Sequence, residues 1–165
     1  MHPQGDAGGE HAAHWQERRT GGIFGRKKRL PPILATIAMS HRPIHAPNLP
    51  KPVGPYSPGM GFERLVFVSG QGGKDPATGA IARDTAAQTE QCLQNVETIL
   101  QAAGTDLQHV LRCGVFLIDM TEFKAMNAVY ERMFGNHRPA RTTVEVSALP
   151  SDGLRVEIDC VAYVP

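Results

Sequence analysis

The sequence predicts an α+β fold in which two helices cover one face of a mixed β-sheet. Two segments, 85–103 and 121–134, carry apolar residues at helical spacing. Five shorter segments around them have the alternation or apolar runs of strands. The order strand, strand, helix, strand, helix, strand, strand is typical of a two-layer α+β sandwich.

Composition divides the chain near residue 42. Residues 1–42 contain seven basic and three acidic residues, a balance of +4, whereas residues 43–165 contain ten basic and thirteen acidic residues, a balance of −3. The first part is polar, rich in glycine and without periodicity. We therefore predict a disordered N-terminal extension over 1–42 and one folded domain over 43–165. In an alternative interpretation, Met39 is the true start and residues 1–38 are an upstream extension of the reading frame.

The domain opens with a predicted β-hairpin. Its strands cover about 56–62 and 65–69, with a turn around Glu63, and "DPATG" at 75–79 is a further turn signal. The first helix follows over 85–103. Thr85 and Gln88 have the spacing of a capping box at its start, and Gly104 predicts its end. Its apolar stripe consists of Leu93, Val96, Ile99, Leu100 and Ala103.

The second half of the domain is predicted to contain a strand, a helix and two further strands. A strand is expected over 110–119 and a helix over about 121–134, with Asp119 and Glu122 at capping-box spacing and Gly135 at its end. Two strands close the chain, 141–149 and 155–164, joined by the turn signal "PSDG". The helix stripe is formed by Phe123, Met126, Tyr130 and Met133.

The last strand shows which face of the sheet the helices should cover. One face is apolar: Val156, Ile158, Cys160, Ala162 and Val164. The other face is charged at one end and apolar at the other: Arg155, Glu157, Asp159, Val161 and Tyr163. A mixed face of this kind fits a subunit interface that contains a polar pocket, better than it fits free solvent or a monomer core.

Arg141 and Glu157 are the first candidates for chemistry. If the last two strands pair as a hairpin, these two side chains share a face. Arginine presents a planar donor fork that suits a carboxylate, and a neighbouring glutamate can orient or deprotonate a water molecule. From spacing alone, an ordinary cross-strand salt bridge is the more common outcome.

Four further residues are candidates with weaker signals. Tyr56 lies between Pro55 and Pro58, where its ring either packs or presents its hydroxyl to a ligand. Ser69 and Gly70 close a strand, in a simple turn or at a close approach of the backbone to a ligand. Asn127 lies within the second helix, on either its solvent face or a site.

Several function classes lack their signatures. No phosphate-binding loop, GxSxG, HExxH or dinucleotide-binding glycine pattern is present. The three cysteines, Cys92, Cys113 and Cys160, have no zinc-site or CxxC spacing, so we expect reduced thiols in the cytoplasm. The mildly acidic domain argues against nucleic acid as its main partner, and no apolar run has the length of a membrane span.

Together these segments closely resemble the RidA/YjgF family of imine/enamine deaminases. The resemblance rests on "GPYSPG", "VFVSGQ", "DPATG", "QTEQCLQNVETIL", "VFLIDMTEFKAMNAVYERMF", "RPARTTVEV" and "VEIDCVA", in this order over 43–165. It implies a chorismate-mutase-like fold. It also implies a homotrimer whose sheets face inward as a central barrel, with pockets at the subunit interfaces.

The resemblance also implies an activity without metal or organic cofactor. The substrates would be 2-iminobutanoate, 2-iminopropanoate and their enamine tautomers, hydrolysed to 2-oxo acids and ammonia, which protects pyridoxal-phosphate enzymes. Arg141 would pair with the substrate carboxylate, and Glu157 would place the attacking water with a backbone carbonyl near Thr143. Tyr56, Ser69, Gly70 and Asn127 would line the pocket.

The sequence departs from the family where Thr143 replaces a frequent cysteine. Alternatives also stay open: a deaminase for an aminoacrylate- or aminomuconate-type substrate, or a metabolite-binding, chaperone-like trimer without turnover. Ribonuclease activity, also attributed to the family, fits poorly with the acidic domain. Only His109 and His137, of seven histidines, lie beyond residue 45.

Overall fold

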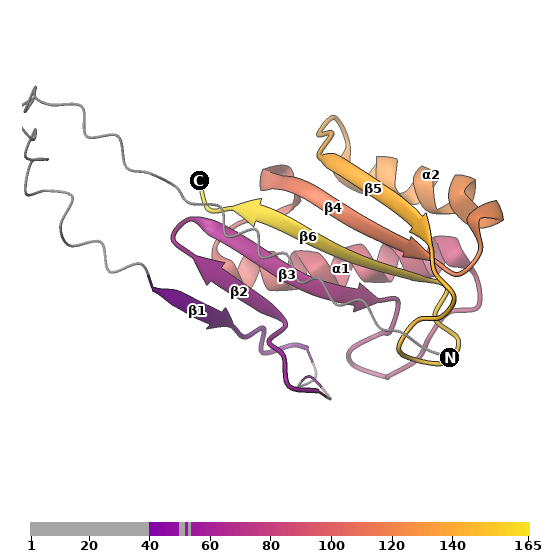
Figure 1. Cartoon of the computed structure of the whole chain (residues 1–165), viewed down its shortest axis with the longest axis horizontal. Helices are drawn as coiled ribbons and strands as arrows, with labels where there is room; N and C mark the ends of the chain where they lie inside the picture. The colour runs from indigo at the N-terminus through magenta and orange to yellow at the C-terminus, as the bar shows by residue number, and fades with distance from the viewer. Residues whose placement is uncertain (1–39, 50–51, 53) are drawn as a thin grey trace, which may run out of the picture. The chain divides into compact units, whose positions relative to one another are not determined.

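One six-stranded sheet with two helices on one of its faces forms the domain (Figure 1). The structure, a computed structural model, describes residues 40–49, 52 and 54–165. The predicted N-terminal extension up to residue 39, including Met39, lies outside the described residues. Within the described part of the chain, no helix has the length and hydrophobicity to cross a membrane.

The sheet has the strand order β1-β2-β3-β6-β4-β5. Only β4 and β5 run parallel; every other neighbouring pair is antiparallel. The strands are β1 (His41–Ile44), β2 (Gly59–Phe62), β3 (Leu65–Gly72), β4 (Val110–Leu117), β5 (Ala140–Glu145) and β6 (Val156–Tyr163).

Strand β1 was not predicted and crosses the expected domain boundary at Pro43. It pairs with the short, glycine-rich β2, and only its last residue, Ile44, is buried. The hairpin of β2 and β3 forms as predicted around Glu63, which has a φ of 51° in its turn.

Helix α1 (Thr85–Ala103) has the predicted bounds but not the predicted cap. The cap is Asp84, whose side chain accepts a hydrogen bond of 2.8 Å from the backbone N–H of Ala87. Gln88 is fully buried and bonds to other segments, so the capping box of Thr85 and Gln88 is wrong. Gly104 ends the helix in the left-handed conformation, as its position predicted.

The segment before α2 (Phe123–Phe134) also differs from its prediction. Asp119 caps a short 3-10 helix, η3 (Met120–Glu122), by accepting from the backbone N–H of Thr121. Glu122 makes no side-chain capping bond to α2, because its carboxylate binds Arg155. The predicted capping box of Asp119 and Glu122 is therefore wrong, although the helix forms and ends at Gly135.

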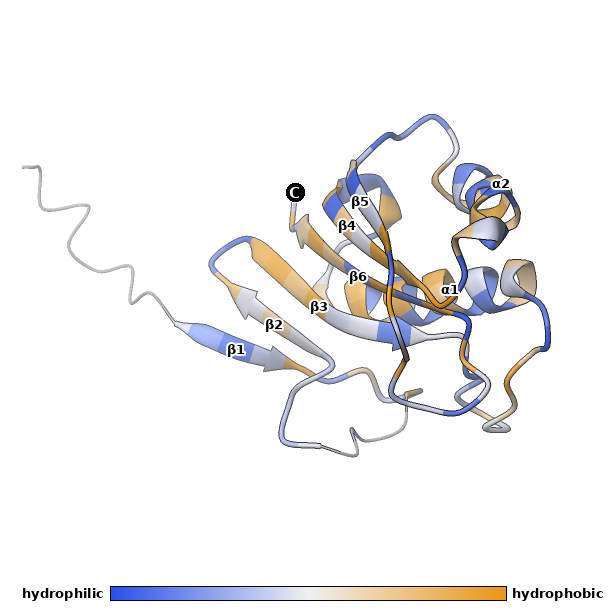
Figure 2. Ribbon diagram, turned by 45° about the vertical axis from the view of Figure 1, so that its right-hand side comes forward, coloured by the Kyte–Doolittle hydropathy of each residue, from blue (hydrophilic) through white to orange (hydrophobic). Residues whose placement is uncertain are grey.

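The core lies between the helices and the face of β6 that was predicted to be covered. Val156, Ile158, Cys160 and Ala162 are all buried there, against the predicted stripe of α1. Buried and partly exposed residues alternate along β6, and hydrophobic residues alternate with acidic ones over its first half, as the ribbon colours in Figure 2 indicate.

Neither α1 nor α2 covers the other face of the sheet, which keeps exposed apolar side chains. Phe67 is 44% exposed and Val144 is 38% exposed. Val161 and Tyr163, which pair with Phe67 and Leu65 across the sheet, are only half-buried. A soluble chain rarely leaves a contiguous face of this kind bare, so it marks an interaction surface.

Candidate active site

The predicted site residues form two separate clusters. Strand β4 lies between β5, which carries Arg141, and β6, which carries Glu157. The register pairs Arg141 with Cys113 and Cys113 with buried Cys160, so Arg141 lies on the helix-covered face. Glu157 pairs with Phe116 on the opposite face. The predicted hairpin of the last two strands, and with it the shared face and the cross-strand salt bridge, is wrong.

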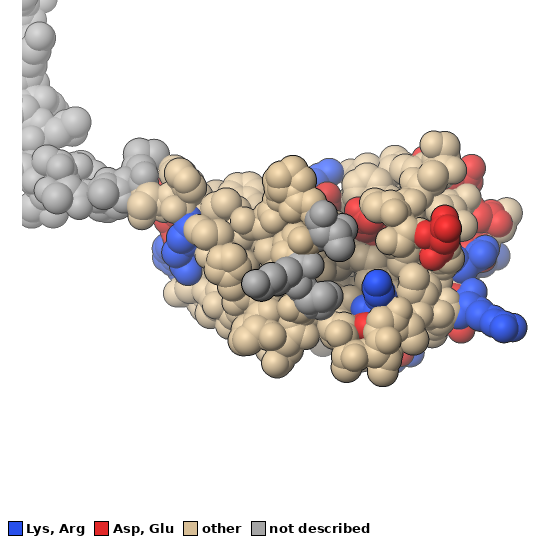
Figure 3. Space-filling model, turned by 90° about the horizontal axis from the view of Figure 1, so that it is seen from below, with Lys and Arg blue, Asp and Glu red and all other residues tan. Residues whose placement is uncertain are grey.

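The first cluster surrounds Glu157 in a cavity of about 590 Å³. Three parts of the chain meet around it: the loop with Tyr56, the stretch of β3 with Ser69 and Gly70, and the loop with Ser151 and Leu154. Figure 3 shows this end of the domain, where uncharged residues cover most of the surface and most charged side chains lie toward the edges. Tyr56 is 54% exposed, so one side of the cavity is open.

A β-bulge brings Ser69 and Gly70 to Glu157. The register of β3 against β6 shifts between Val68 and Gln71, which leaves Ser69 and Gly70 opposite Asp159. The Ser69 hydroxyl donates to the carbonyl of Ser57 at 2.8 Å, which ties the Tyr56 loop to the bulge. A Cβ at position 70 would lie 2.1 Å from Oε1 of Glu157, so glycine is required for the carboxylate to reach this place.

Glu157 has an environment suited to a proton acceptor. Burial raises the pKa of its carboxyl group, and the nearby negative charge of Asp159 raises this pKa further. Among the described residues, no basic side chain forms an ion pair with it. Its carboxylate is consequently more basic than that of a solvated glutamate and is free to bind a water molecule.

The second cluster surrounds Arg141. Its Nη2 donates to Oδ1 of Asn127 at 2.8 Å, so Asn127 is on the site side of α2 and not on its solvent face. The guanidinium carbon lies 4.5 Å from the ring centroid of Tyr130 and 5.6 Å from that of Phe123. These contacts orient the fork beside a cavity of about 300 Å³. Within the described segments, no carboxylate pairs with Arg141.

Tyr130 is the residue that the sequence reasoning assigned only to the core stripe. Its spacing of three from Asn127 places both side chains on one helix face, which is the signal for a shared role. Its hydroxyl has no hydrogen-bond partner among the described residues, although the Cys113 thiol lies near it. Burial raises the pKa of this hydroxyl well above the usual range, so Tyr130 stays neutral beneath the cation.

Thr143 lies two residues after Arg141 on the same face of β5 and lines neither cavity. Its hydroxyl is buried without a partner in the described part of the chain. No group of three or more metal-ligating side chains occurs in the described residues.

The geometry can now be compared with known proteins. Residues 46–164 match a family model described as Endoribonuclease L-PSP, which is the RidA/YjgF family. The chain belongs to the RidA/YjgF family. The family resemblance of the sequence is thereby confirmed, and so is the fold class, since solved RidA/YjgF structures have the same two-layer fold.

Some relatives of this chain are named by family and others by activity. A RutC family protein of Pyrococcus horikoshii is 46% identical over 121 residues, 73% of this chain and 95% of that protein. A 2-iminobutanoate/2-iminopropanoate deaminase of Salmonella typhimurium is 41% identical over 122 residues, 72% of this chain and 94% of that protein.

Solved structures agree with this assignment. The YjgF protein of Escherichia coli superposes with a TM-score of 0.71 at 36% identity, covering 75% of this chain and 99% of that chain. TdcF of Escherichia coli, solved with bound serine, has a TM-score of 0.70 at 34% identity and covers 74% and 98% of the two chains.

Proposed function

We propose that this RidA/YjgF protein is a deaminase that hydrolyses 2-imino acids such as 2-iminobutanoate and 2-iminopropanoate to 2-oxo acids and ammonia. The observation that carries the proposal is the presence of two groups in one chain: an oriented Arg141 guanidinium and a Glu157 carboxylate with a raised pKa. Among the described residues, neither group has an ion-pair partner. The first suits the carboxylate of an imino acid and the second suits a water molecule. Relatives at about 40% identity are named as deaminases of this kind.

The two clusters act together if the protein is a homotrimer. Arg141 and Glu157 lie on opposite faces of one sheet, so a small substrate cannot touch both within one chain. The exposed apolar side chains on the Glu157 face support packing of a second subunit there. In the trimer, Arg141 of one subunit and the Glu157 cavity of its neighbour form each site.

The proposed reaction adds water across the C=N bond. An enamine first tautomerises to its imine, whose carbon is electrophilic. The imine reacts in its form protonated at nitrogen. Arg141 binds the carboxylate, and Glu157 accepts a proton from water as the oxygen bonds to the carbon and the C=N π electrons move to nitrogen, which gives a carbinolamine. Glu157 gives this proton to the amine and then accepts the proton of the carbinolamine hydroxyl as the C–N bond breaks and the C=O bond of the 2-oxo acid forms. Ammonia takes that proton and leaves as ammonium.

A larger imino acid is a second candidate substrate. The cavity around Glu157, about 590 Å³, lies within the size range of pockets for drug-sized ligands and exceeds the need of a four-carbon acid. Relatives named only as RutC family proteins leave room for such a preference. Comparison of imines made from threonine with imines of longer amino acids separates the two candidates.

Ribonuclease activity has little support in the site. The His137 ring contacts the carbonyl of Val110 at 2.6 Å, and the His109 ring contacts Asp106. His109 is held within its own segment and His137 against the start of β4; His137 lines the Arg141 cavity, but neither histidine lies in the Glu157 cavity, so the two do not form a catalytic pair there. RNA cleavage that Arg141→Lys abolishes would be needed to support this activity.

Three buried free thiols, Cys92, Cys113 and Cys160, favour a reducing compartment such as the cytoplasm for this reaction.

The test of the function itself uses 2-iminobutanoate generated from threonine by a dehydratase, with semicarbazide to trap the free imine. Wild type should divert the imine to 2-oxobutanoate, and Arg141→Ala should not. Equal trapping with and without the wild-type protein would contradict the proposal.

A further inference from the structure

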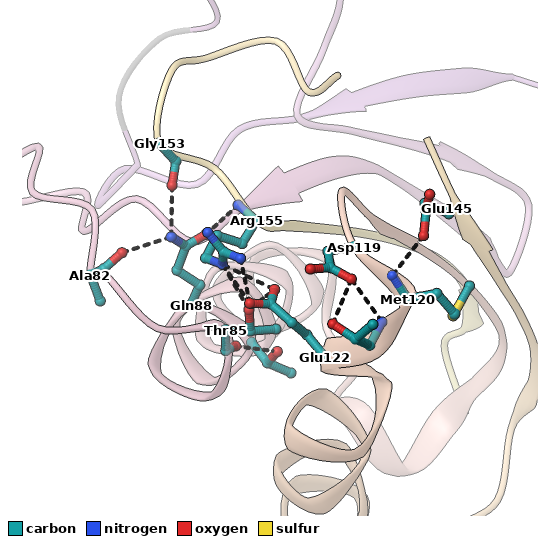
Figure 4. A network of polar contacts seen from close by, with 11 residues as sticks. Ala82, Thr85, Gln88, Asp119, Met120, Glu122, Glu145, Gly153 and Arg155 are labelled. Atoms are coloured by element: carbon teal, nitrogen blue, oxygen red, sulfur yellow. Dashed lines mark hydrogen bonds and ion pairs between the residues drawn. The ribbon is translucent and has the colours of Figure 1, made fainter. Parts of the chain in front are cut away.

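A polar network outside both clusters joins the strand of Glu157 to the helix that orients Arg141 (Figure 4). Its members come from α1, from η3 and from the residue before β6. Neither the binding step nor the hydrolytic step proposed above uses them. Their contacts indicate what they contribute.

Gln88 fixes the chain that enters β6. It is fully buried, and its Oε1 accepts from the backbone N–H of Arg155 at 2.8 Å. Its Nε2 donates to the carbonyls of Ala82 at 2.7 Å and Gly153 at 2.8 Å. A buried amide with both ends bonded holds its partners in one geometry. The backbone two residues before Glu157 is therefore tied to α1.

Arg155 extends this connection to Glu122. Its Nε donates to the two carboxylate oxygens of Glu122 at 2.9 and 3.0 Å, and its Nη2 also contacts that carboxylate. The Thr85 hydroxyl donates to the same group. The side chains of Arg155 and Glu122 are partly buried, at 32% and 22% exposed, and several charge-assisted hydrogen bonds fix the geometry of the pair.

Glu122 immediately precedes α2, which holds the partners of Arg141. Phe123 begins that helix and contacts the guanidinium, and Asn127 and Tyr130 follow on the same side. An ion pair at the start of a helix limits its shift and rotation relative to the strand that it contacts. The pair therefore links the position of these three side chains to β6.

We propose that Glu122 and Arg155 are positioning residues whose ion pair holds α2 where Asn127 and Tyr130 keep the Arg141 guanidinium ready for the substrate carboxylate. The effect of this ion pair on turnover rests on the proposed function. The effect of the ion pair on the orientation of Arg141 does not rest on it and can be measured without substrate.

The chain offers a matched control pair. Nη2 of Arg132 on α2 lies 2.8 Å from Oε2 of Glu90 on α1, with side chains 59% and 44% exposed. This pair also connects the two helices and has the same chemistry. Arg132 lies in the last turn of α2, far from its start, and neither residue belongs to the network that reaches β6.

The first measurement is kinetic, with 2-iminobutanoate formed in situ. Glu122→Gln and Arg155→Met should each raise KM about tenfold with kcat within about threefold, because the carboxylate clamp is displaced while Glu157 is intact. The KM of the double variant should be no higher than that of the single variant with the larger KM, because both substitutions remove the same ion pair. Arg155→Lys should recover part of the affinity. Glu90→Gln and Arg132→Met should leave KM unchanged.

The second measurement is NMR of protein labelled in arginine, with the Arg141 signal identified by Arg141→Lys. Stacking on Tyr130 should shift the Arg141 side-chain protons upfield in wild type, and Glu122→Gln should reduce that shift without any ligand. An unchanged Arg141 signal and unchanged KM, with only thermal stability lowered, would overturn the inference. A changed signal in a protein without deaminase activity would support the positioning role and reject the proposed function.

Discussion

Arg141 and Glu157 lie on opposite faces of one sheet, with β4 between their strands. Each has the surroundings of a functional group: among residues 40–49, 52 and 54–165, no carboxylate pairs with the oriented guanidinium of Arg141, and no cation pairs with the half-buried carboxylate of Glu157. In the trimer that we propose, the Arg141 cluster of one copy and the Glu157 cluster of another together form one complete site. The separation of these residues is thus the structural basis of the trimer proposal.

The ring of Tyr130 should matter more than its hydroxyl. Tyr130→Phe keeps the aromatic face beneath Arg141 and should leave KM within about threefold, whereas Tyr130→Leu should raise KM about tenfold by removing the cation–π contact. Arg141→Lys should raise KM on the order of 10- to 100-fold, because a point charge replaces a fork. Steady-state kinetics on the three variants measures these effects. Equal KM values for the Phe and Leu variants would show that the ring is not a support for Arg141.

Gly70→Ala should damage catalysis without unfolding the protein. The new Cβ would collide with Oε1 of Glu157, which is the free end of a flexible side chain and can move away. We expect kcat to fall on the order of 100-fold from misplacement of the carboxylate, with unfolding free energy changed by less than about 1 kcal/mol. Gly61→Ala, on β2 outside the cavity, is the matched control and should retain kcat. Retained kcat in Gly70→Ala would argue against Glu157 as the group that places water.

Glu157→Gln should abolish turnover and stabilise the fold at neutral pH. Because the pKa of Glu157 is raised in the folded protein, its contribution to stability is present below the unfolded pKa, about 4.3, and is lost as pH rises through the folded pKa. At pH 7 the glutamine variant should therefore melt at a higher temperature than wild type. The difference should disappear below about pH 4, where Glu157 is protonated in both states.

The same pKa should appear in the activity profile. Wild-type kcat/KM should rise with pH through an apparent pKa above the ordinary glutamate range, because the ionised form accepts the proton. Melting curves between about pH 3 and 8, and initial rates over the part of this range where the protein stays folded, test both statements. A glutamine variant less stable than wild type at pH 7 would contradict a raised pKa of Glu157 in the folded protein.

Local pattern was sufficient to predict most elements of the fold. The stripe of Leu93, Val96, Ile99 and Leu100 predicted α1, because helical spacing and core burial coincide there, and Gly104 predicted its end. Strand β1 escaped prediction because its four residues bury only Ile44 and its partner β2 is rich in glycine. Its pairing is a tertiary feature that four residues do not reveal.

The arrangement of the site could not be derived from spacing. The turn signal "PSDG" between the last two predicted strands suggested a hairpin, but β6 inserts between β3 and β4, and this order depends on long-range pairing. Glu122 looked like part of a cap because capping boxes and ion pairs use the same residue types. Only the folded chain brings Arg155 to it, 33 residues later in the sequence.

Subunit complementation tests the central claim most directly. Arg141→Ala and Glu157→Ala subunits, each inactive alone, are unfolded, mixed in equal amounts and refolded together. If each site combines Arg141 of one subunit with Glu157 of its neighbour, random trimers should recover about a quarter of the wild-type activity per subunit, since one interface in four joins the two intact groups. No recovery, with trimers formed and refolded wild type active, would contradict a site shared between subunits.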